Sequence, residues 1–358
     1  MISKAFFQNI DEVANENDLS KEHVYQAFEQ GLIAACKKQL GVQTCRVEFR
    51  EEKNELLIWG QYFVLPEGEI SLDLDRKYTF LKLADAKALS AKAKAGEVLE
   101  VKIEPSEFNY NASRDLKHRF NEVLNTIKKE SIYQGLKKLQ YEVVNARVLE
   151  VEQEFYRIEI TKDVITMLPK KESLPNDKFH IGDRIKVYVT DVEMKTKGPK
   201  IYVSRTHVNL VTRLLEEHVP EIKDGTIEVL GIARDPGDRS KVGLRSNNEN
   251  VDVIGATVGE GGVRIKEISK FLSGEKIDLF RWSDNEKDLI ANSLQPAPVI
   301  AVTKLNPKEK SALAIVPDAQ LSLAIGKLGQ NVKLAVQASG WSIDIKSESI
   351  AASEGIIY

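Results

Sequence analysis

Cysteine and histidine are scarce in this chain of 358 residues, and neither shows the spacing of a metal site. The two cysteines, Cys36 and Cys45, are too few for a disulfide framework and do not form a zinc-ligand pattern. Cys36 occupies an apolar position of a helical pattern, which favours a reduced core thiol. No two of the five histidines have the i, i+4 spacing of a zinc-binding helix. We therefore expect no metal and no other cofactor.

Long apolar runs are missing as well. No segment approaches the roughly 20 apolar residues that a membrane-spanning helix needs. The N-terminal stretch MISKAFFQNIDEVANEND becomes acidic at once and lacks the apolar core of a signal peptide. The apolar content of 42% and the charged content of 29% are typical of a globular protein. We expect a cytoplasmic protein, and the length favours two to four domains.

Net positive charge is also missing, because the chain carries a formal charge of −3. The charge is unevenly distributed. Residues 1–75 contain 7 basic and 14 acidic residues, whereas the remainder contains 44 basic and 40 acidic residues. Any polyanion-binding surface is therefore expected downstream of residue 75, and the acidic N-terminal part is better suited to a protein partner.

The first 138 residues alternate between helical and β-rich patterns. Ser20 is a predicted N-cap for a helix over 21–41, whose apolar residues recur at helical spacing. A long helix is predicted over roughly 109–138, with one apolar stripe that we interpret as core packing. The other predicted elements are two strands within 45–65 around the turn EEKNE, an alanine-rich helix over ADAKALSAKAKAGE (84–97), and a strand over VLEVKIEP (98–105).

Residues 139–205 have a different character, with five short β-rich runs separated by turn residues. That number and spacing favour a small five-stranded barrel of the OB type. The phrases HIGDRIKVYV and GPKIYVSRT resemble the RNA-binding domain first described in ribosomal protein S1. Arg184 and Arg205 are candidate phosphate contacts, and Phe155, Tyr156 and Tyr188 are candidate base-stacking residues. Aromatic residues in strands are usually core residues, so packing is the favoured interpretation of these three.

The rest of the chain contains an internal repeat. Residues 209–282 and 285–347 both read as helix, two strands, short helix, GxxG loop, helix and strand. The first glycines of the two loops, Gly259 and Gly326, are 67 residues apart. This order of elements is that of prokaryotic-type (type II) KH domains.

The GxxG loop of a KH domain lies against a nucleic-acid backbone. Glycine permits a sharp turn and a close approach to phosphates, and the next helix directs its first N–H groups at the anion. A lone GxxG is more often a helix C-cap, but two copies at equivalent places are a strong signal. Neither copy has the spacing of a nucleotide-binding P-loop. The candidate RNA-binding residues of the repeats are Gly259, Glu260, Gly261, Gly262, Arg264 and Lys266 in the first, and Gly326, Lys327, Leu328, Gly329, Gln330, Asn331 and Lys333 in the second.

The two loops differ in charge. Lys327 supplies a cation in the second loop, whereas Glu260 places a negative charge in the first, where Arg264 and Lys266 could offset it. We expect the second KH domain to contribute more RNA affinity than the first.

Two further sets of residues have competing interpretations. Arg234, Arg239 and Lys241 lie around a turn between strands and are either RNA contacts or a solvated hairpin tip. Trp282 and Trp341 are more typical of packing in the KH sheets than of base stacking.

Several segments resemble the NusA family of bacterial transcription factors: GPKIYVSRTHVNLVTRLLEEHVPEIKDGTIEVLGIARDPGDRSKVGLRSN, GATVGEGGVRIKEI, GEKIDLFRWS and VPDAQLSLAIGKLGQNVKLAVQASGWSIDI. The resemblance is close over residues 139–347 and looser over 1–138. In that N-terminal part GEISLDL, ADAKAL and GEVLEVKIEPSEF keep the family's rhythm, whereas NYNASRDLKHRF departs from it.

The resemblance implies a multidomain α+β protein without enzymatic activity. Its expected parts are an N-terminal α/β polymerase-binding domain (1–138), an S1-like OB barrel (139–205), two type II KH domains (206–283 and 284–350) and a short tail (351–358). Because AASEGIIY follows the second KH domain closely, we expect the form of the family without acidic C-terminal repeats.

The resemblance also implies partners and a role. The N-terminal domain would dock on DNA-directed RNA polymerase at the β flap near the RNA exit channel, and the other domains would bind nascent single-stranded RNA. Other Nus factors would join in antitermination, and the protein would act as a monomer that modulates pausing and intrinsic termination.

Two other functions use the same modules. A phosphorolytic ribonuclease carries KH and S1-like domains in the opposite order behind large catalytic cores, and the chain shows no nucleophile or metal motif. An RNA-binding protein of ribosome assembly or translation is harder to separate from sequence alone. Co-purification with polymerase rather than with ribosomal particles would discriminate between the two.

Overall fold

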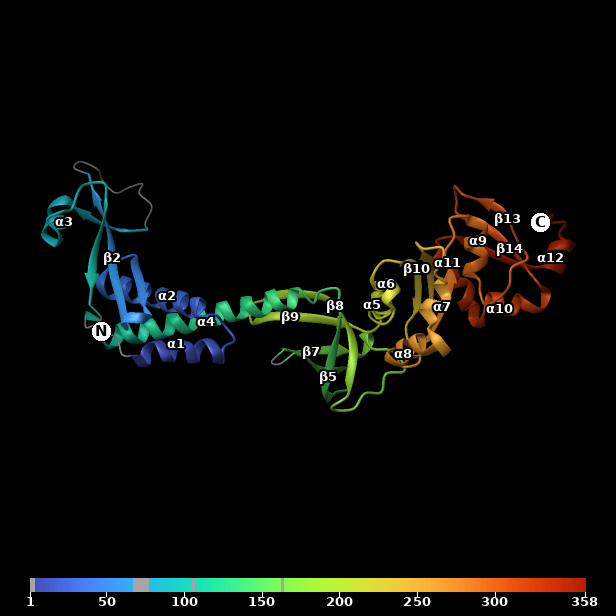
Figure 1. Ribbon diagram of the computed structural model, residues 1–358, viewed down its shortest axis with the longest axis horizontal. Coiled ribbons are helices and arrows are strands. Elements are labelled where there is room, and N and C mark those ends of the chain that lie inside the picture. Colours follow the sequence, from blue (N-terminus) through green and yellow to red (C-terminus); the bar gives the residue numbers. More distant parts are fainter. Residues whose placement is uncertain (1–3, 67–76, 105–106, 162–163) are drawn as a thin grey trace. The chain divides into compact units, whose positions relative to one another are not determined.

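The computed structural model describes residues 4–66, 77–104, 107–161 and 164–358. It divides the chain into two compact units, Met1–Gly135 with Thr196–Pro199, and Leu136–Lys195 with Lys200–Tyr358. Figure 1 labels their elements. The segment GEISLDL (68–74) lies outside the described residues. Within the described ranges, no helix combines the length and apolar character needed to span a bilayer.

The first unit packs helices against a mixed sheet in which β2 pairs antiparallel with β1 and β4 and parallel with β3. Its strands are β1 (Cys45–Arg50), β2 (Glu55–Leu65), β3 (Thr79–Lys82) and β4 (Val98–Ile103). Its helices are α1 (Lys4–Glu16), α2 (Lys21–Leu40), α3 (Leu83–Leu89) and α4 (Tyr110–Lys137), the last of which continues into the second unit. The predicted long helix and all three predicted strands are therefore confirmed.

Helix α2 begins and ends where its sequence predicts. The Ser20 side chain accepts a hydrogen bond from the backbone N–H of His23, and Gly41 closes the helix with a left-handed φ of 68°. The buried face of α2 contributes Leu32 and Cys36 to a cluster with the sheet, and the Cys36 thiol is fully buried as predicted. Leu116, from the apolar stripe of α4, packs against the same cluster.

The alanine-rich segment 84–97 was predicted to be helical throughout, and this prediction is wrong in its second half. Helix α3 ends at Leu89, and Ser90 has an extended backbone. Ala93 instead packs against Val64 of β2, and the Gly96 N–H donates to the Val64 carbonyl. Tertiary contacts with β2 therefore outweigh the helix propensity of alanine.

Five strands of the second unit form the predicted barrel-like sheet, in the order β7-β6-β5-β8-β9. The Thr166 hydroxyl of β7 donates to the Ile201 carbonyl of β9 at 2.7 Å, so the two outer strands of this order approach each other. The strands are β5 (Val143–Val151), β6 (Phe155–Thr161), β7 (Val164–Pro169), β8 (Arg184–Lys195) and β9 (Gly198–Ser204).

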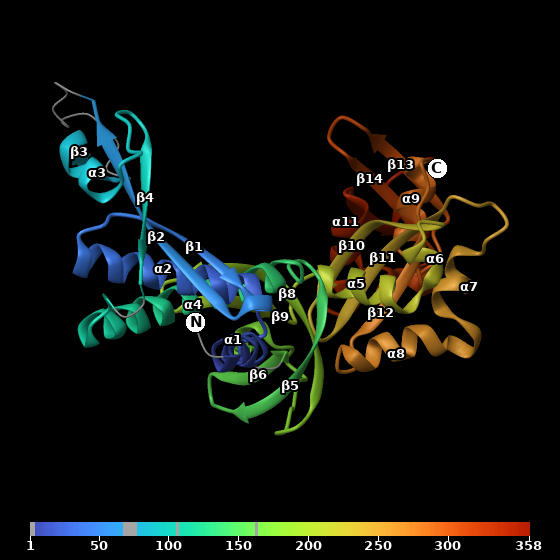
Figure 2. The same ribbon diagram turned by 60° about the vertical axis from the view of Figure 1, so that its left-hand side comes forward.

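Two repeats with the same topology follow the barrel (Figure 2). In each sheet the central strand pairs antiparallel with the strand before it and parallel with the last one; Val242, for example, lies between Ile232 and Leu279. The first repeat consists of α5 (Asn209–His218), α6 (Pro220–Lys223), β10 (Ile227–Asp235), β11 (Arg239–Ser246), α7 (Val253–Val258), α8 (Val263–Phe271) and β12 (Lys276–Arg281). The second consists of α9 (Glu286–Ser293), β13 (Ala301–Asn306), β14 (Ser311–Val316), α10 (Leu321–Ile325), α11 (Gln330–Ser339) and β15 (Ser342–Ser347), followed by α12 (Glu348–Ser353). The predicted order of elements is confirmed in both repeats.

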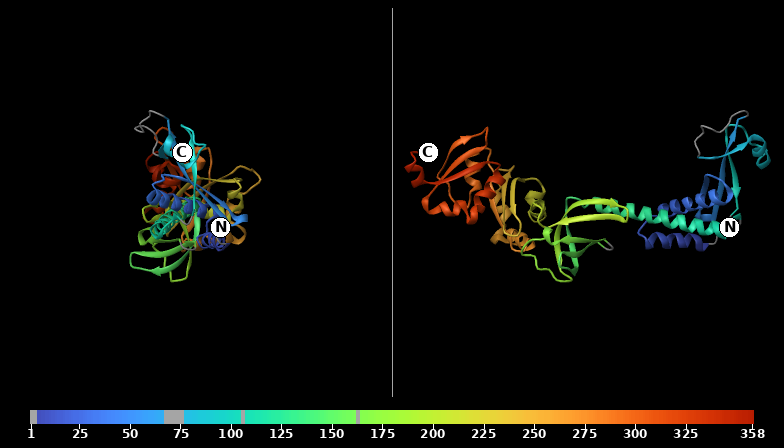
Figure 3. Two further views of the ribbon diagram at one scale, coloured as in Figure 1. Left: turned by 90° about the vertical axis from the view of Figure 1, so that its left-hand side faces the viewer. Right: turned by 180° about the vertical axis from the view of Figure 1, so that it is seen from behind.

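The three parts of the second unit share apolar cores. Leu174 and Tyr188 of the barrel belong to the core of the first repeat. Ala233 and Phe280 of the first repeat belong to the core of the second, whose helix α11 packs against β10 (Figure 2). Figure 3 shows the two repeats, coloured yellow to red, next to each other from a further side. Burial at these junctions joins barrel and repeats into one packed body.

Candidate nucleic-acid interface

The two GxxG loops have the same backbone conformation. Gly259 and Gly326 have φ/ψ of 76°/166° and 76°/169°, a region that is essentially restricted to glycine. The third loop residues, Gly261 and Leu328, have φ of 60° and 54°. In both loops the last glycine is left-handed and serves as the N-cap of the next helix. The sequence repeat is therefore a repeat of loop geometry.

Each loop presents the positive end of a helix. The N-cap glycines of α8 and α11 have no side chain, so within the described chain no cap side chain accepts the first N–H groups. The first helical N–H groups, of Val263 and Gln330, donate to the Glu260 and Lys327 carbonyls of their loops, and the helix dipole at such an end favours an anion. This geometry suits a phosphate of a nucleic-acid backbone.

The second loop adds exposed, positively charged side chains. Lys327 and Lys333 are exposed, and neither forms an ion pair among the described residues. Leu328, at the loop tip, is 98% exposed. The Gln330 amide has a different task, because it donates to Asp235 and Asp238 of the first repeat, at 2.7 Å each. Gln330 thus connects the two repeats.

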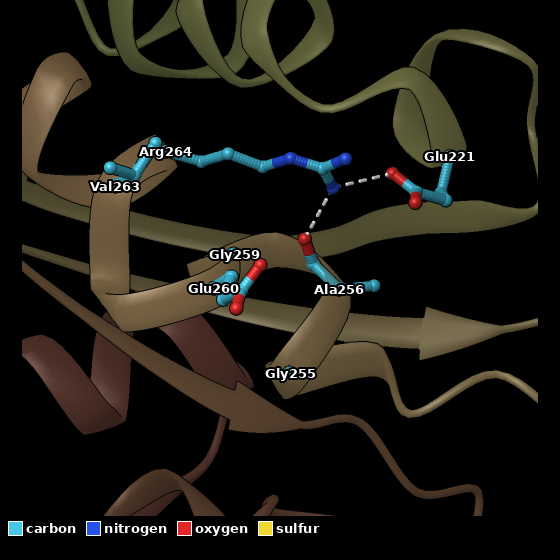
Figure 4. A pocket seen from close by; sticks show the side chains of 7 residues that line it. All are labelled: Glu221, Gly255, Ala256, Gly259, Glu260, Val263 and Arg264. Carbon is cyan, nitrogen blue, oxygen red and sulfur yellow. Dashed lines mark hydrogen bonds and ion pairs between the residues drawn. The ribbon is translucent and has the colours of Figure 1, made fainter.

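The first loop is electrostatically different (Figure 4). Glu260 is exposed, and the Lys266 ammonium donates to the Gly261 carbonyl of the loop itself at 2.8 Å. One nitrogen of the Arg264 guanidinium donates both to the Glu221 carboxylate at 2.8 Å and to the Ala256 carbonyl at 2.6 Å. Glu260, Arg264, Glu221 and Ala256 line an open pocket of about 530 Å³ beside the loop.

Arg264 and Asn331 are equivalent in the two repeats, each following its loop's last glycine by two residues. The Asn331 amide donates to the Ala324 carbonyl, just as Arg264 donates to that of Ala256. Both side chains therefore hold the helix before the loop to the helix after it. Asn331 is only 7% exposed, so its predicted RNA contact is corrected to this structural role.

The prediction that Arg205 contacts RNA phosphates is wrong, because Arg205 is only 1% exposed. Its guanidinium forms a two-bonded ion pair with Asp177, at 2.7 and 2.8 Å, and donates to the carbonyls of Lys186 and Phe271. Because Asp177 and Lys186 belong to the barrel and Phe271 to the first KH repeat, Arg205 joins the two domains.

The three predicted hairpin residues do not form a solvated tip, because two of their side chains are buried and the third is partly buried and paired. The Arg234 side chain is 2% exposed and paired with the fully buried Glu275, and Arg239 is paired with Asp278. Lys241 is 1% exposed and donates to the Gln295 carbonyl of the second repeat. Burial lowers the pKa of Lys241 to about 8. Sequence spacing could not show that these basic side chains are covered by neighbouring residues.

Most of the aromatic candidates are buried by packing, which is the interpretation that the sequence favours. Tyr156 and Tyr188 are 3% and 2% exposed, and Tyr188 stacks on His207. Burial lowers the pKa of His207, with a smaller contribution from nearby Arg234. Phe155 stays partly accessible. Trp341 is buried and Trp282 packs partly buried against the core of the second repeat, which confirms the packing interpretation of both.

Arg184 is exposed and lies directly opposite Arg147 of β5. The exposed Arg147 was not among the sequence candidates, although the alternation of buried and exposed residues in β5 was a signal for it. Two like charges opposite each other disfavour the free sheet, and an RNA phosphate between them would relieve the repulsion.

Four family models match successive parts of the chain. They are described as NusA N-terminal domain (residues 5–130), S1 RNA binding domain (141–204), NusA-like first KH domain (205–282) and NusA-like second KH domain (286–353).

Three similar proteins carry the name transcription termination/antitermination protein NusA. The Halalkalibacterium halodurans protein is 36% identical over 99% of this chain and 91% of its own length. The Bacillus subtilis protein is 37% identical over 95% of this chain and 90% of its own length. The Thermus thermophilus protein is 33% identical over 98% and 92%.

Proposed function

Because the chain belongs to the NusA family of transcription termination/antitermination factors, we propose that it docks on RNA polymerase near the RNA exit channel and modulates pausing there. The protein is a non-enzymatic factor, and its partners are RNA polymerase and RNA. The finer proposal is that the N-terminal domain binds the flap of the polymerase β subunit, whereas the barrel and KH repeats hold nascent single-stranded RNA. A polymerase partner implies that the protein acts in the cytoplasm.

The observation that supports this RNA assignment most is the matched pair of GxxG loops. Both present glycine-only backbone and a helix N-terminus without a side-chain cap, within one packed unit. The proposed contacts of the second loop are Gly326, Lys327, Leu328, Gly329 and Lys333, and those of the first are Gly259, Glu260, Gly261, Gly262 and Lys266. On the barrel we propose Arg184 together with Arg147.

The charge distribution supports the assignment of protein binding to the N-terminal part and of RNA binding to the other domains. Residues 1–75 carry seven more acidic than basic residues, which would repel RNA and suits a protein partner. Because a polymerase-bound factor meets nascent RNA at high effective concentration, a few phosphate contacts provide sufficient affinity. Other Nus factors would join the same complex during antitermination.

The test is pause lifetime at a hairpin-stabilised site, measured with purified bacterial RNA polymerase with and without the protein. We expect the full chain to lengthen the pause, and a variant lacking residues 1–138 to bind RNA without doing so. An unchanged pause with intact RNA binding would contradict polymerase docking. Co-purification with ribosomal particles would then favour a role in ribosome assembly or translation.

A further inference from the structure

We propose that Glu221 is an electrostatic latch on the first KH loop, where its carboxylate competes with RNA phosphates for Arg264. This inference deepens the proposed function and rests on RNA binding by the KH repeats. Figure 4 shows the guanidinium of Arg264 directed across the pocket to Glu221. The latch would keep the first loop weaker than the second until RNA displaces the carboxylate.

The ion pair is positioned to exchange partners. The side chains of Arg264 and Glu221 are 30% and 31% exposed, so water and a polyanion can reach them. Only one guanidinium nitrogen is engaged with described residues, and it is shared between Glu221 and the Ala256 carbonyl. A phosphate could therefore take the remaining donors in the two-bonded geometry that arginine favours.

The second repeat serves as an internal comparison. At the position of Arg264 it has Asn331, whose amide holds the Ala324 and Leu294 carbonyls without any carboxylate. The task of holding the loop therefore needs no charge. In the first loop Glu221 neutralises the positive charge of Arg264, and the exposed Glu260 adds a negative charge. The second loop instead carries the positive charge of Lys327.

The experiment measures the affinity of the full chain for single-stranded RNA by fluorescence anisotropy. Each substitution is made in the parent and in the double variant Lys327→Asp/Leu328→Asp, whose second loop is impaired so that binding by the first loop is seen more directly. Both substituted residues of that background are exposed loop residues, and aspartate tolerates the left-handed conformation of residue 328. We expect Glu221→Gln to tighten binding in both by about two- to fivefold, the equivalent of one partly exposed ion pair. The gain should shrink at high salt.

The matched control is Glu216→Gln, which removes the same charge from the Glu216–Arg213 pair, whose side chains are 33% and 35% exposed. An equal gain from this control would reduce the effect to net charge and overturn the latch. Arg264→Gln keeps an amide for Ala256 but removes the cation, so Glu221→Gln should bring no gain in that background. A gain that persists there, or weaker binding by Glu221→Gln alone, would also overturn it.

Failure of the latch and failure of the proposed function are distinguishable. If the parent does not bind single-stranded RNA and the two loop aspartates change nothing, RNA binding by the KH repeats is wrong, and the latch fails with it. If the parent binds and the loop aspartates weaken binding, yet Glu221→Gln gives no gain, only the latch is wrong.

Discussion

Arg205 and Asp177 form an ion pair whose two side chains are each 1% exposed. Burying two charges costs much of their hydration, and the pair offsets this cost through added hydrogen bonds to backbone carbonyls and to Ser273. Removing one partner leaves the other as an uncompensated buried charge. The pair therefore makes the barrel–KH junction sensitive to a single substitution.

Arg205→Ala should lower the free energy of unfolding by about 3–5 kcal/mol. Chemical denaturation followed by circular dichroism measures this loss. The control is Arg157→Ala, which breaks an ion pair with Glu150 whose side chains are 44% and 49% exposed, and it should cost less than about 1 kcal/mol. Equal losses from the two variants would contradict the structural role of Arg205.

Lys241 makes stability depend on pH in a direction unusual for a lysine. Burial lowers its pKa in the folded protein to about 8, from an ordinary value of 10.5. Below pH 8 both states hold the proton, and the full cost of burying the charge is present. Between pH 8 and 10.5 only the unfolded state holds it, so stability rises with pH.

Relative to Lys241→Met, which has no such titration, the parent should therefore gain unfolding free energy between pH 7 and 10.5. The shift corresponds to about 3 kcal/mol at most. Denaturant midpoints of the two proteins across that pH range measure the gain, and subtraction removes the other titrating groups. A difference that is constant or falls with pH would show that the Lys241 pKa is not lowered.

At the scale of elements, local signals predicted most of the fold. Short β-rich runs between turn residues predicted the barrel strands, and the repeat predicted both KH topologies. The helix prediction for segment 84–97 is wrong in its second half because contacts with β2, which is distant in sequence, end the helix. The same limit applies to Arg205 and Asn331, since a polar residue type does not reveal whether its partner lies in solvent or in a neighbouring domain.

The two loops allow a matched prediction. Gly326→Asp should weaken RNA binding by about tenfold, roughly 1.4 kcal/mol, and more than Gly259→Asp does. Both glycines have the glycine-only backbone, but a Cβ on Gly326 would meet the Asn331 backbone nitrogen at 2.7 Å, whereas on Gly259 it meets the flexible Arg264 side chain. The second loop also carries the cation Lys327.

Fluorescence anisotropy with one RNA oligonucleotide gives both affinities. Lys327→Met and Glu260→Gln separate charge from strain, because they leave the glycines unchanged; the former should weaken binding and the latter strengthen it. A larger loss from Gly259→Asp than from Gly326→Asp would reverse our ranking of the two repeats.

At the scale of the whole molecule, the second unit is a continuous structure because each junction is packed and hydrogen bonded. At the KH–KH junction, Gly231 of β10 lies so close to α11 that a Cβ would come within 2.2 Å of the Ala338 carbonyl oxygen and 2.6 Å of the Trp282 ring. Glycine is required there for close approach rather than for an unusual φ. The two loops therefore keep a fixed geometry, and one RNA strand can engage both with little added entropic cost.

Gly231→Ala should separate β10 from α11 and lower the free energy of unfolding by about 1–3 kcal/mol. The two loops should then no longer keep a fixed spacing. The parent should bind an RNA long enough to span both loops much more tightly than a short one, and the variant should lose most of that ratio while keeping its affinity for short RNA. Gly135→Ala is the control, since no described residue outside its own helix backbone comes within 4 Å of the added Cβ, and it should leave the ratio unchanged. A destabilised Gly231→Ala protein with an unchanged ratio would mean that the two repeats bind RNA independently.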